Sequence, residues 1–231
     1  MRIAALNGVC GNFEEAVAKT NEILRVRGQV LPVTGSDIRL CAELENGSLI
    51  CGESRIPPEA IRQSSPIARV FLKPEKPAAT EVALKAIRKA DLILIGPGSL
   101  FTSIIPNFLV DGISREVQSC MARKILVCNM MTQPGETDRY SVWDHVTRIA
   151  EYLGDDIIEY VIANNKMIDA EALRPYKEDK AEQIVPTDRD RRLLQEKRIT
   201  LIENNFVDVK KGYIRHDADR IASVAYSLIC D

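Results

Sequence analysis

Residues 91–103 read DLILIGPGSLFTS, and this stretch decides the expected fold. Its aliphatic run, LILI, has the length and composition of a strand that is buried on both faces. The run ends on Gly96, Pro97 and Gly98, which predict a sharp turn. Hydroxyl side chains follow the turn, so the strand is expected to open into a polar loop that leads to a helix.

Similar aliphatic runs recur along the chain and alternate with amphipathic segments. Unbroken aliphatic strands separated by helices are typical of a parallel sheet covered on both faces. We therefore expect an α/β, Rossmann-like fold of three layers with a mostly parallel sheet, in a single domain over residues 1–231. The expected order is a helix over 78–89, a strand at 92–95, a helix over 107–118, a strand at 124–128, a helix over 141–153, and strands at 157–163 and 198–204.

Two segments near the start of the chain have local signals of their own. Asn46 and Gly47 separate two short apolar segments, which predicts a β-hairpin that leaves the main sheet. Asn12 precedes an amphipathic segment with early acidic residues, so a capped helix is expected over 13–27 and is ended by Gly28.

The signal weakens after Asn165. The polar stretch there is interpreted as a surface excursion with one short strand at 182–185. The charged run at 189–198 is expected to be the solvated face of a helix. A helix that starts near His216 is expected to close the fold.

The composition excludes some classes of partner. Thirty-one basic and 33 acidic side chains give the 231-residue chain a formal charge of −2. Such a balance argues against a general binder of nucleic acid or of acidic membranes, which depends on excess positive charge. No apolar run approaches the roughly 20 residues that cross a bilayer. We therefore expect a cytoplasmic protein, without a membrane span, whose partner is a small molecule or another protein.

The cysteines and histidines give little sign of a metal site. None of the cysteines forms a CxxC pair, so buried free thiols are expected rather than disulfides or a zinc site. His145 is interpreted as a packing residue because no nucleophile motif accompanies it, and His216 is expected to be exposed. The six cysteines are Cys10, Cys41, Cys51, Cys120, Cys128 and Cys230.

Two loops that follow strands carry the candidate site. In an open parallel sheet the ligand binds beside the carboxyl ends of the strands. The first loop, residues 96–107, reads GPGSLFTSIIPN, and its bare amides beside a helix start favour an anion. It matches neither the Walker pattern nor GxGxxG. The alternative is a tight turn whose hydroxyl residues only cap the helix.

The second loop, residues 129–138, reads NMMTQPGETD. Its uncharged hydrogen-bonding groups and two acids suit a ribose, another sugar or a magnesium ion. Gln133 is one of these groups, although Thr137 or Asp138 can equally be the cap of the next helix. Because the two loops leave adjacent parallel strands, they are expected to face one another across the sheet edge.

These loops closely resemble a known family, the YvcK/CofD-like proteins, in the branch called gluconeogenesis factors. The resemblance implies a Rossmann-like fold, binding of a nucleotide sugar such as UDP-N-acetylglucosamine or UDP-glucose, and a role in growth and cell shape on gluconeogenic carbon sources. Catalysis in this branch is not established. The strings that carry the likeness are GPGSLFTSIIPNFLVDGI at 96–113, CNMMTQPGETD at 128–138, RGQVLP at 27–32 and CAELENG at 41–47.

The related CofD branch is implied to consist of Mg²⁺-dependent 2-phospho-L-lactate transferases, so such an enzyme is the alternative function. Glu136 and Asp138 are then the candidate metal-linked acids. A third interpretation is a protein-interaction remnant with a vestigial pocket. The family likeness places ligand contacts on Gly96, Gly98, Ser99, Thr102 and Ser103 of the first loop, and on Asn129, Thr132, Gly135, Glu136 and Thr137 of the second.

The chain departs from the family pattern in two places. Family members normally begin with a strand, a glycine-rich turn and an acidic segment, whereas this chain starts after them, as a shortened paralogue or a fragment. Loss of that strand exposes a sheet edge, so a homo-oligomer is expected. In addition, Arg139 stands where the family usually has glycine.

Overall fold

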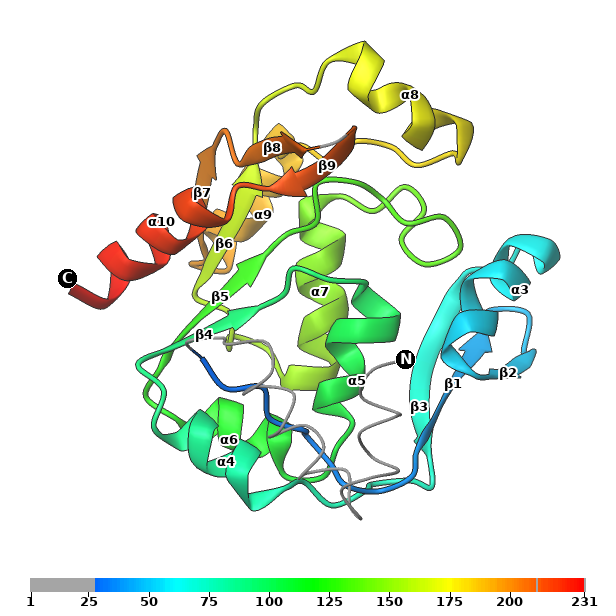
Figure 1. Ribbon diagram of the computed structural model, residues 1–231, viewed down its shortest axis with the longest axis vertical. Helices are drawn as coiled ribbons and strands as arrows, with labels where there is room; N and C mark the ends of the chain where they lie inside the picture. Colours follow the sequence, from blue (N-terminus) through cyan, green and yellow to red (C-terminus); the bar gives the residue numbers. More distant parts are fainter. Residues whose placement is uncertain (1–27, 211, 231) are drawn as a thin grey trace.

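A computed structural model describes residues 28–210 and 212–230, and its centre is a parallel sheet (Figure 1). The strand order is β4-β5-β6-β7, and every neighbouring pair is parallel. This arrangement confirms the expected α/β class with a parallel sheet. The helix expected over 13–27 and the residue Cys10 lie outside the described residues. The four strands are β4 (Leu92–Ile95), β5 (Arg123–Val127), β6 (Tyr160–Asn164) and β7 (Thr200–Asn204).

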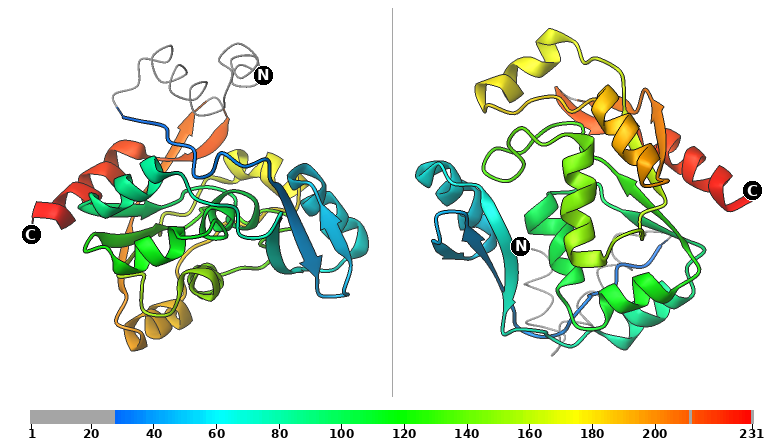
Figure 2. Two further views of the ribbon diagram at one scale, coloured as in Figure 1. Left: turned by 90° about the horizontal axis from the view of Figure 1, so that it is seen from below. Right: turned by 180° about the vertical axis from the view of Figure 1, so that it is seen from behind.

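Helices cover both faces of this sheet, which gives three layers (Figure 2). Side chains alternate across a strand, so β5 serves two cores. Ile125 and Val127 pack with the apolar side of α10 (Ala218–Cys230). Leu126 belongs to the larger cluster on the other face, which includes the buried side of α7 (Val142–Leu153). The aliphatic run of β5 is therefore explained by burial on two sides. The same expectation was wrong for β4, which lies at the end of the sheet order, because only Ile95 is buried there and Leu94 is 41% exposed.

A second, antiparallel sheet lies to one side of the main sheet. Its order is β2-β1-β3, and the turn between β1 and β2 is the predicted hairpin. Gly47 adopts a φ of 83°, and Asn46 Oδ1 accepts a hydrogen bond from Ser48 N at 3.0 Å. These features are typical of a turn that requires Asn-Gly. The elements are β1 (Arg39–Leu44), β2 (Leu49–Cys51), η1 (Glu53–Arg55), α3 (Ile56–Gln63) and β3 (Ile67–Lys73).

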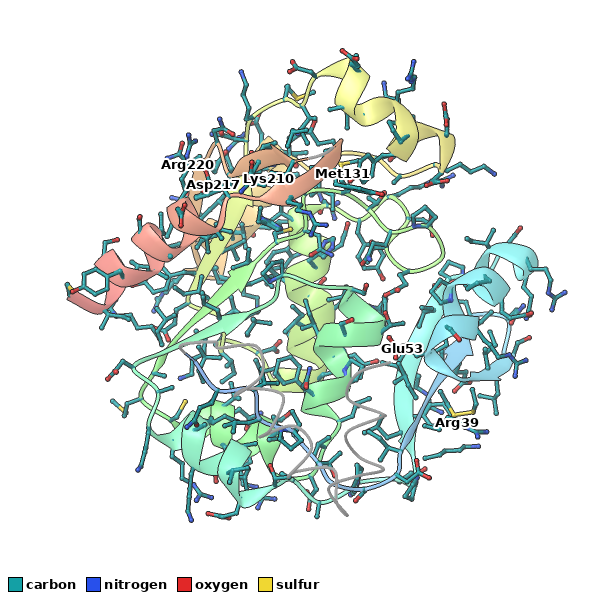
Figure 3. All side chains as sticks on the ribbon, in the orientation of Figure 1. Arg39, Glu53, Met131, Lys210, Asp217 and Arg220 are labelled. Carbon is teal, nitrogen blue, oxygen red and sulfur yellow. A yellow bond between two sulfur atoms is a disulfide. The ribbon has the colours of Figure 1, made fainter. Side chains whose placement is uncertain are left out.

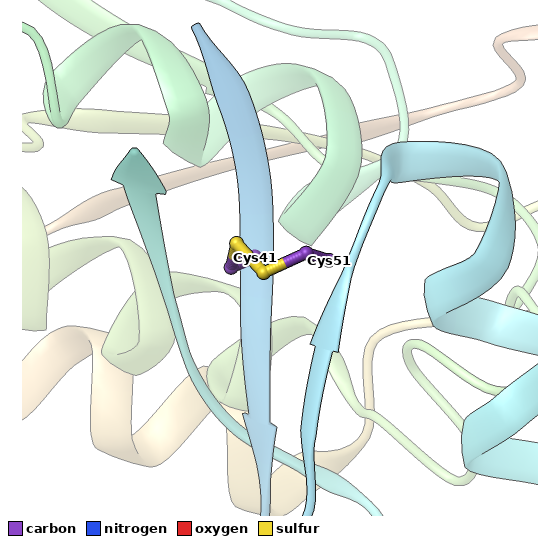
Figure 4. Close-up of a disulfide and its surroundings, with 2 residues drawn as sticks. All are labelled: Cys41 and Cys51. Atoms are coloured by element: carbon purple, nitrogen blue, oxygen red, sulfur yellow. A yellow bond between two sulfur atoms is a disulfide. The ribbon is translucent and has the colours of Figure 1, made fainter. Parts of the chain in front are cut away.

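A disulfide joins Cys41 to Cys51 across this hairpin (Figure 4). The expectation of free thiols was wrong for these two residues. The register of the hairpin places them directly opposite each other, with 4.0 Å between their Cα atoms. Sequence spacing alone does not show this register. Cys120, Cys128 and Cys230 are free, although Cys230 is exposed rather than buried.

The helix expected over 107–118 is divided and begins earlier. A π-helical turn, η2 (Leu100–Ile104), leads directly into α5 (Ile105–Phe108), and α6 (Ile113–Ser119) follows as a separate helix. Gly112 precedes α6 with a φ of 91°, a conformation that cannot continue a right-handed helix. The helix expected over 78–89 is present as α4 (Glu81–Arg88), with Thr80 as its N-cap.

The chain after β6 contains more structure than its sequence suggested. The polar excursion includes a helix, α8 (Ala170–Glu178), and the expected strand at 182–185 is reduced to an isolated bridge between Met131 and Gln183. The charged run forms α9 (Asp188–Glu196), as expected. A hairpin that was not predicted follows β7, formed by β8 (Val207–Lys210) and β9 (Tyr213–His216).

His216 therefore ends a strand rather than starting a helix. Its side chain is half-buried, and burial lowers its pKa to about 4. The expectation that it is exposed was wrong because the hairpin was missed. None of the helices in the described ranges combines the length and the apolarity that a membrane span requires.

Candidate ligand-binding site

The two loops face each other, as predicted, because β4 and β5 are adjacent and parallel (Figure 1). Hydrogen bonds join them directly. Asn129 Nδ2 donates to Gly98 O at 3.0 Å, and Gln133 Nε2 donates to Ser99 Oγ at 2.7 Å. The second loop therefore fixes the position of the first at the carboxyl edge of the sheet.

Glu136 makes the third connection between the loops. Its carboxylate accepts hydrogen bonds from Phe101 N at 3.2 Å and from Thr102 Oγ1 at 3.0 Å. The residue is only 7% exposed. Burial raises the pKa of this carboxyl group. Hydrogen bonds from Thr102 and Phe101 oppose the rise, and the negative charge of Glu53 adds to it. Figure 3 labels Glu53, which comes from η1 beside the antiparallel sheet.

In the structure, the first loop is therefore already hydrogen-bonded to an acidic side chain of the protein, Glu136. The sequence assigned the backbone amides at the start of η2 to a ligand. One of them, Phe101 N, already donates to Glu136. A ligand that takes this amide has to displace the carboxylate of Glu136.

Gln133, one of the polar groups that the sequence offered in the second loop, is not among the contacts carried over from the family likeness. Its backbone N donates to Thr137 Oγ1 at 2.9 Å, and its side chain reaches Ser99. The other side-chain atom, Oε1, is buried and has no hydrogen-bond partner. A buried amide oxygen without a donor is costly, and such an atom at the junction of two loops is suited to a ligand hydroxyl or N–H group.

Two glycines of the loops are required by packing within the protein. A Cβ atom on Gly96, whose φ is 89°, would lie 3.2 Å from Val127 O. A Cβ atom on Gly135, whose φ is 81°, would lie 2.4 Å from Pro57 O at the start of α3. The tight-turn alternative for the first loop therefore accounts for Gly96 without a ligand, and packing against α3 accounts for Gly135.

The predicted site residues differ in whether a ligand can reach them. Thr132 is hydrogen-bonded to the polar segment that follows α8. Its N donates to Glu182 O and its Oγ1 accepts from Glu182 N, each at 2.8 Å. Thr137 is completely buried. Ser103 is exposed. The predicted residues that are not buried are Gly96, Gly98, Ser99, Thr102, Ser103 and Asn129.

His145 packs beneath this region, as the sequence suggested. It is 2% exposed, and its Nδ1 lies 2.8 Å from Ser141 O. Its ring meets Tyr140 edge-on, and Tyr140 in turn meets Phe101 of the first loop with 6.3 Å between ring centroids. Burial lowers the pKa of His145, which keeps the imidazole neutral. The rings of His145 and Tyr140 thus pack in series against Phe101 and help to hold the first loop in place.

The two acids of the second loop do not fit a magnesium ion as they are arranged. Both oxygens of Glu136 already accept hydrogen bonds, and Asp138 Oδ2 accepts one from Gly135 N at 2.7 Å. Mg²⁺ is usually bound through one or two carboxylates that face the same space. Within the described parts of the chain, no three His, Cys, Asp or Glu side chains gather closely enough to hold a metal.

Arg139 has a backbone conformation that glycine adopts more readily. Its φ is 62°, in the left-handed region, and its side chain is exposed. The family pattern expects glycine at this position, and the observed φ gives the physical reason.

Comparison with known proteins agrees with the resemblance. Residues 1–207 match the family model described as 2-phospho-L-lactate transferase CofD. The chain is 42% identical, over 229 residues, to a protein of Clostridium acetobutylicum named putative gluconeogenesis factor, covering 99% of this chain and 50% of that one. It is 40% identical to the gluconeogenesis factor of Bacillus subtilis, covering 98% of this chain and 69% of the relative.

A crystal structure of a UPF0052 family member from Bacillus halodurans has the same fold. It superposes with a TM-score of 0.88 at 35% identity, covering 97% of this chain and 70% of that one. The chain thus spans half the length of the Clostridium relative and about two thirds of the others. The chain belongs to the CofD family, in the branch of the proteins named gluconeogenesis factor.

Proposed function

We propose that the chain binds a nucleotide sugar, such as UDP-N-acetylglucosamine or UDP-glucose, between the first and second loops. In this proposal it is a cytoplasmic regulatory protein that supports growth and cell shape on gluconeogenic carbon sources. The names of the relatives support the link to gluconeogenesis. No nucleophile and base adjoin one another at the loops, which favours a binding role over a catalytic one.

The observation that carries this proposal is the pair of groups on Gln133. Its Nε2 already orders the hydroxyl of Ser99, while its buried Oε1 has no donor. A nucleotide sugar offers many donors, among them sugar hydroxyls and the base N–H. One such donor satisfies Oε1 and removes the cost of leaving it unpaired.

Isothermal titration calorimetry of the chain with UDP-N-acetylglucosamine tests the proposal. We expect saturable binding, and we expect Gln133→Ala to weaken it about tenfold or more because one buried hydrogen bond is lost. Gln195→Ala is the matched control, since Gln195 is exposed on α9, and it should leave the affinity unchanged. Absence of heat at millimolar ligand, or equal loss in both variants, contradicts the proposal.

The second candidate is a Mg²⁺-dependent 2-phospho-L-lactate transferase, which the matching family model favours. Glu136 and Asp138 would have to leave Thr102 and Gly135 before they could share a metal ion. The test is release of nucleoside monophosphate from a nucleotidyl-lactate donor in the presence of Mg²⁺ and a deazaflavin. Product formation that Glu136→Gln abolishes would establish this function in place of the first.

We also propose that the chain forms a homo-oligomer through the edge of β4. Among the described residues, β5 is the one strand that pairs with β4. Leu94 is 41% exposed on this aliphatic edge, whereas open edges usually carry charges or proline. Analytical ultracentrifugation should give a multiple of 25.8 kDa, and Leu94→Lys should return it to the monomer mass. A monomeric wild-type chain excludes this association.

A further inference from the structure

A second cleft lies apart from the two loops, where the antiparallel sheet meets the helices α5 and α6. Its volume is about 540 Å³, within the range of small-molecule pockets. It is lined by β3, by the turn after β3, and by the segment from the end of α5 into α6. None of its lining residues belongs to the first or second loop, so it is a separate place for a ligand.

The interior of this cleft is apolar and partly aromatic. Phe71 from β3 and Phe108 from the end of α5 both line it, and both are half-buried. Arg69 also lines the cleft, but it is already paired with Glu43 at 2.6 Å and lies over the ring of Phe71. Arg69 therefore forms part of the cleft lining, and its charge is largely neutralised by Glu43.

Four other charged side chains surround the apolar surface. Lys76 and Arg115 are cations, Glu75 and Asp111 are anions, and all four are exposed. Within the described ranges these side chains form neither an ion pair nor a hydrogen bond. The unpaired charge of these four lining residues is thus balanced, with two groups of each sign. Lys73, outside the lining, lies over the ring of Phe71, with 5.8 Å between Nζ and the ring centroid.

We propose that this cleft binds a zwitterionic α-amino acid with an apolar side chain. The side chain lies against Phe71 and Phe108, the carboxylate faces Arg115 and Lys76, and the ammonium group faces Glu75 and Asp111. A simple anion would meet two uncompensated carboxylates, and a simple cation would meet two uncompensated cations. A ligand with both signs is the class that this arrangement favours, and the inference is independent of the proposed nucleotide-sugar site.

Three small probes separate the contributions of the two charges. L-phenylalanine carries both, 3-phenylpropionate lacks the ammonium group, and phenethylamine lacks the carboxylate. Titrations of the full chain, followed by NMR shifts of the Phe71 and Phe108 amides, should show saturable binding of L-phenylalanine. The two analogues should bind about tenfold more weakly, because each loses one charge-assisted contact.

The variant Arg115→Glu tests the position of the carboxylate. It should weaken L-phenylalanine about tenfold, whereas Arg192→Glu, at an exposed arginine on α9, should leave the affinity unchanged. Unchanged circular dichroism confirms that both variants fold. Equal binding of the three probes would mean a non-selective apolar crevice, and either that result or the lack of a saturable response to L-phenylalanine overturns the proposal.

Discussion

Glu136 and Thr102 lie 34 residues apart and join the two loops through a 3.0 Å hydrogen bond between Oε1 and Oγ1. The same carboxylate accepts from Phe101 N, so the start of η2 depends on a side chain of the neighbouring loop. The geometry of the candidate site is therefore a property of the two loops together.

Removing the carboxylate should loosen both loops. Glu136→Ala leaves Phe101 N and the Thr102 hydroxyl without their acceptor in a buried place. We expect the free energy of unfolding to fall by about 2 kcal/mol. Urea denaturation measures this change. Glu45→Ala, at an exposed residue of the β1–β2 turn, should cost little, and an equally small effect of Glu136→Ala would contradict the role given to the carboxylate.

The same group should make stability depend on pH. Burial, joined by the charge of Glu53, raises the pKa of Glu136 above its ordinary value of 4.5. The folded state therefore holds this proton more tightly than the unfolded chain does. The stabilisation is fully present below the unfolded pKa and is lost as pH rises through the raised pKa of the folded state.

Glu136→Gln cannot titrate at this position, so part of that decline should disappear. Urea denaturation of both proteins from about pH 4 to about pH 7 measures the difference in slope. The wild-type free energy of unfolding should fall more steeply than that of the variant over this interval. Parallel curves would show that Glu136 has the same pKa in the folded and unfolded states.

Gly135 should tolerate no side chain. Its φ of 81° is unfavourable for alanine, and a Cβ atom would lie 2.4 Å from the carbonyl oxygen of Pro57. Gly135→Ala should cost about 3 kcal/mol or more in thermal or urea unfolding. Gly47→Ala has nearly the same φ, 83°, but open space around it, so it should cost only about 1–2 kcal/mol. Equal costs would mean that the contact with α3 is absent.

The disulfide should stabilise the hairpin. It closes a loop with a sequence separation of 10 residues. For a loop of this size, Cys51→Ala should lower the free energy of unfolding by about 2–3 kcal/mol. Adding dithiothreitol to the wild-type protein should reproduce most of that loss. Cys230→Ser, at an exposed free thiol, serves as the control, and a wild-type protein insensitive to reductant contradicts the prediction.

The main elements could be predicted because their signals are local. LILI is recognisable as a strand from its own composition, although only Ile95 of its residues is buried, and Asn46-Gly47 specifies a turn without help from the rest of the chain. The β8–β9 hairpin carried a weaker local signal, the glycine at 212 between two short alternating segments. That pattern is sufficient to predict a hairpin at this point of the chain.

Other missed features depend on a strand register, a backbone conformation or a side-chain contact that the sequence pattern does not show. The Cys41–Cys51 bond follows from a hairpin register, and the break before α6 follows from the left-handed conformation of Gly112. The family likeness placed Glu136 among the ligand contacts, whereas its hydrogen bond with Thr102 shows that it also joins the second loop to the first. Such roles appear only when the two strands are placed side by side.

The first and second loops are proposed to hold a nucleotide sugar together. Crystals of the chain grown with UDP-N-acetylglucosamine would show whether it binds there. We expect density for the ligand beside the hydrogen-bonded pair of Ser99 and Gln133, with a donor within hydrogen-bond distance of Gln133 Oε1. Ligand density elsewhere on the molecule, with Oε1 still unpaired, would contradict it.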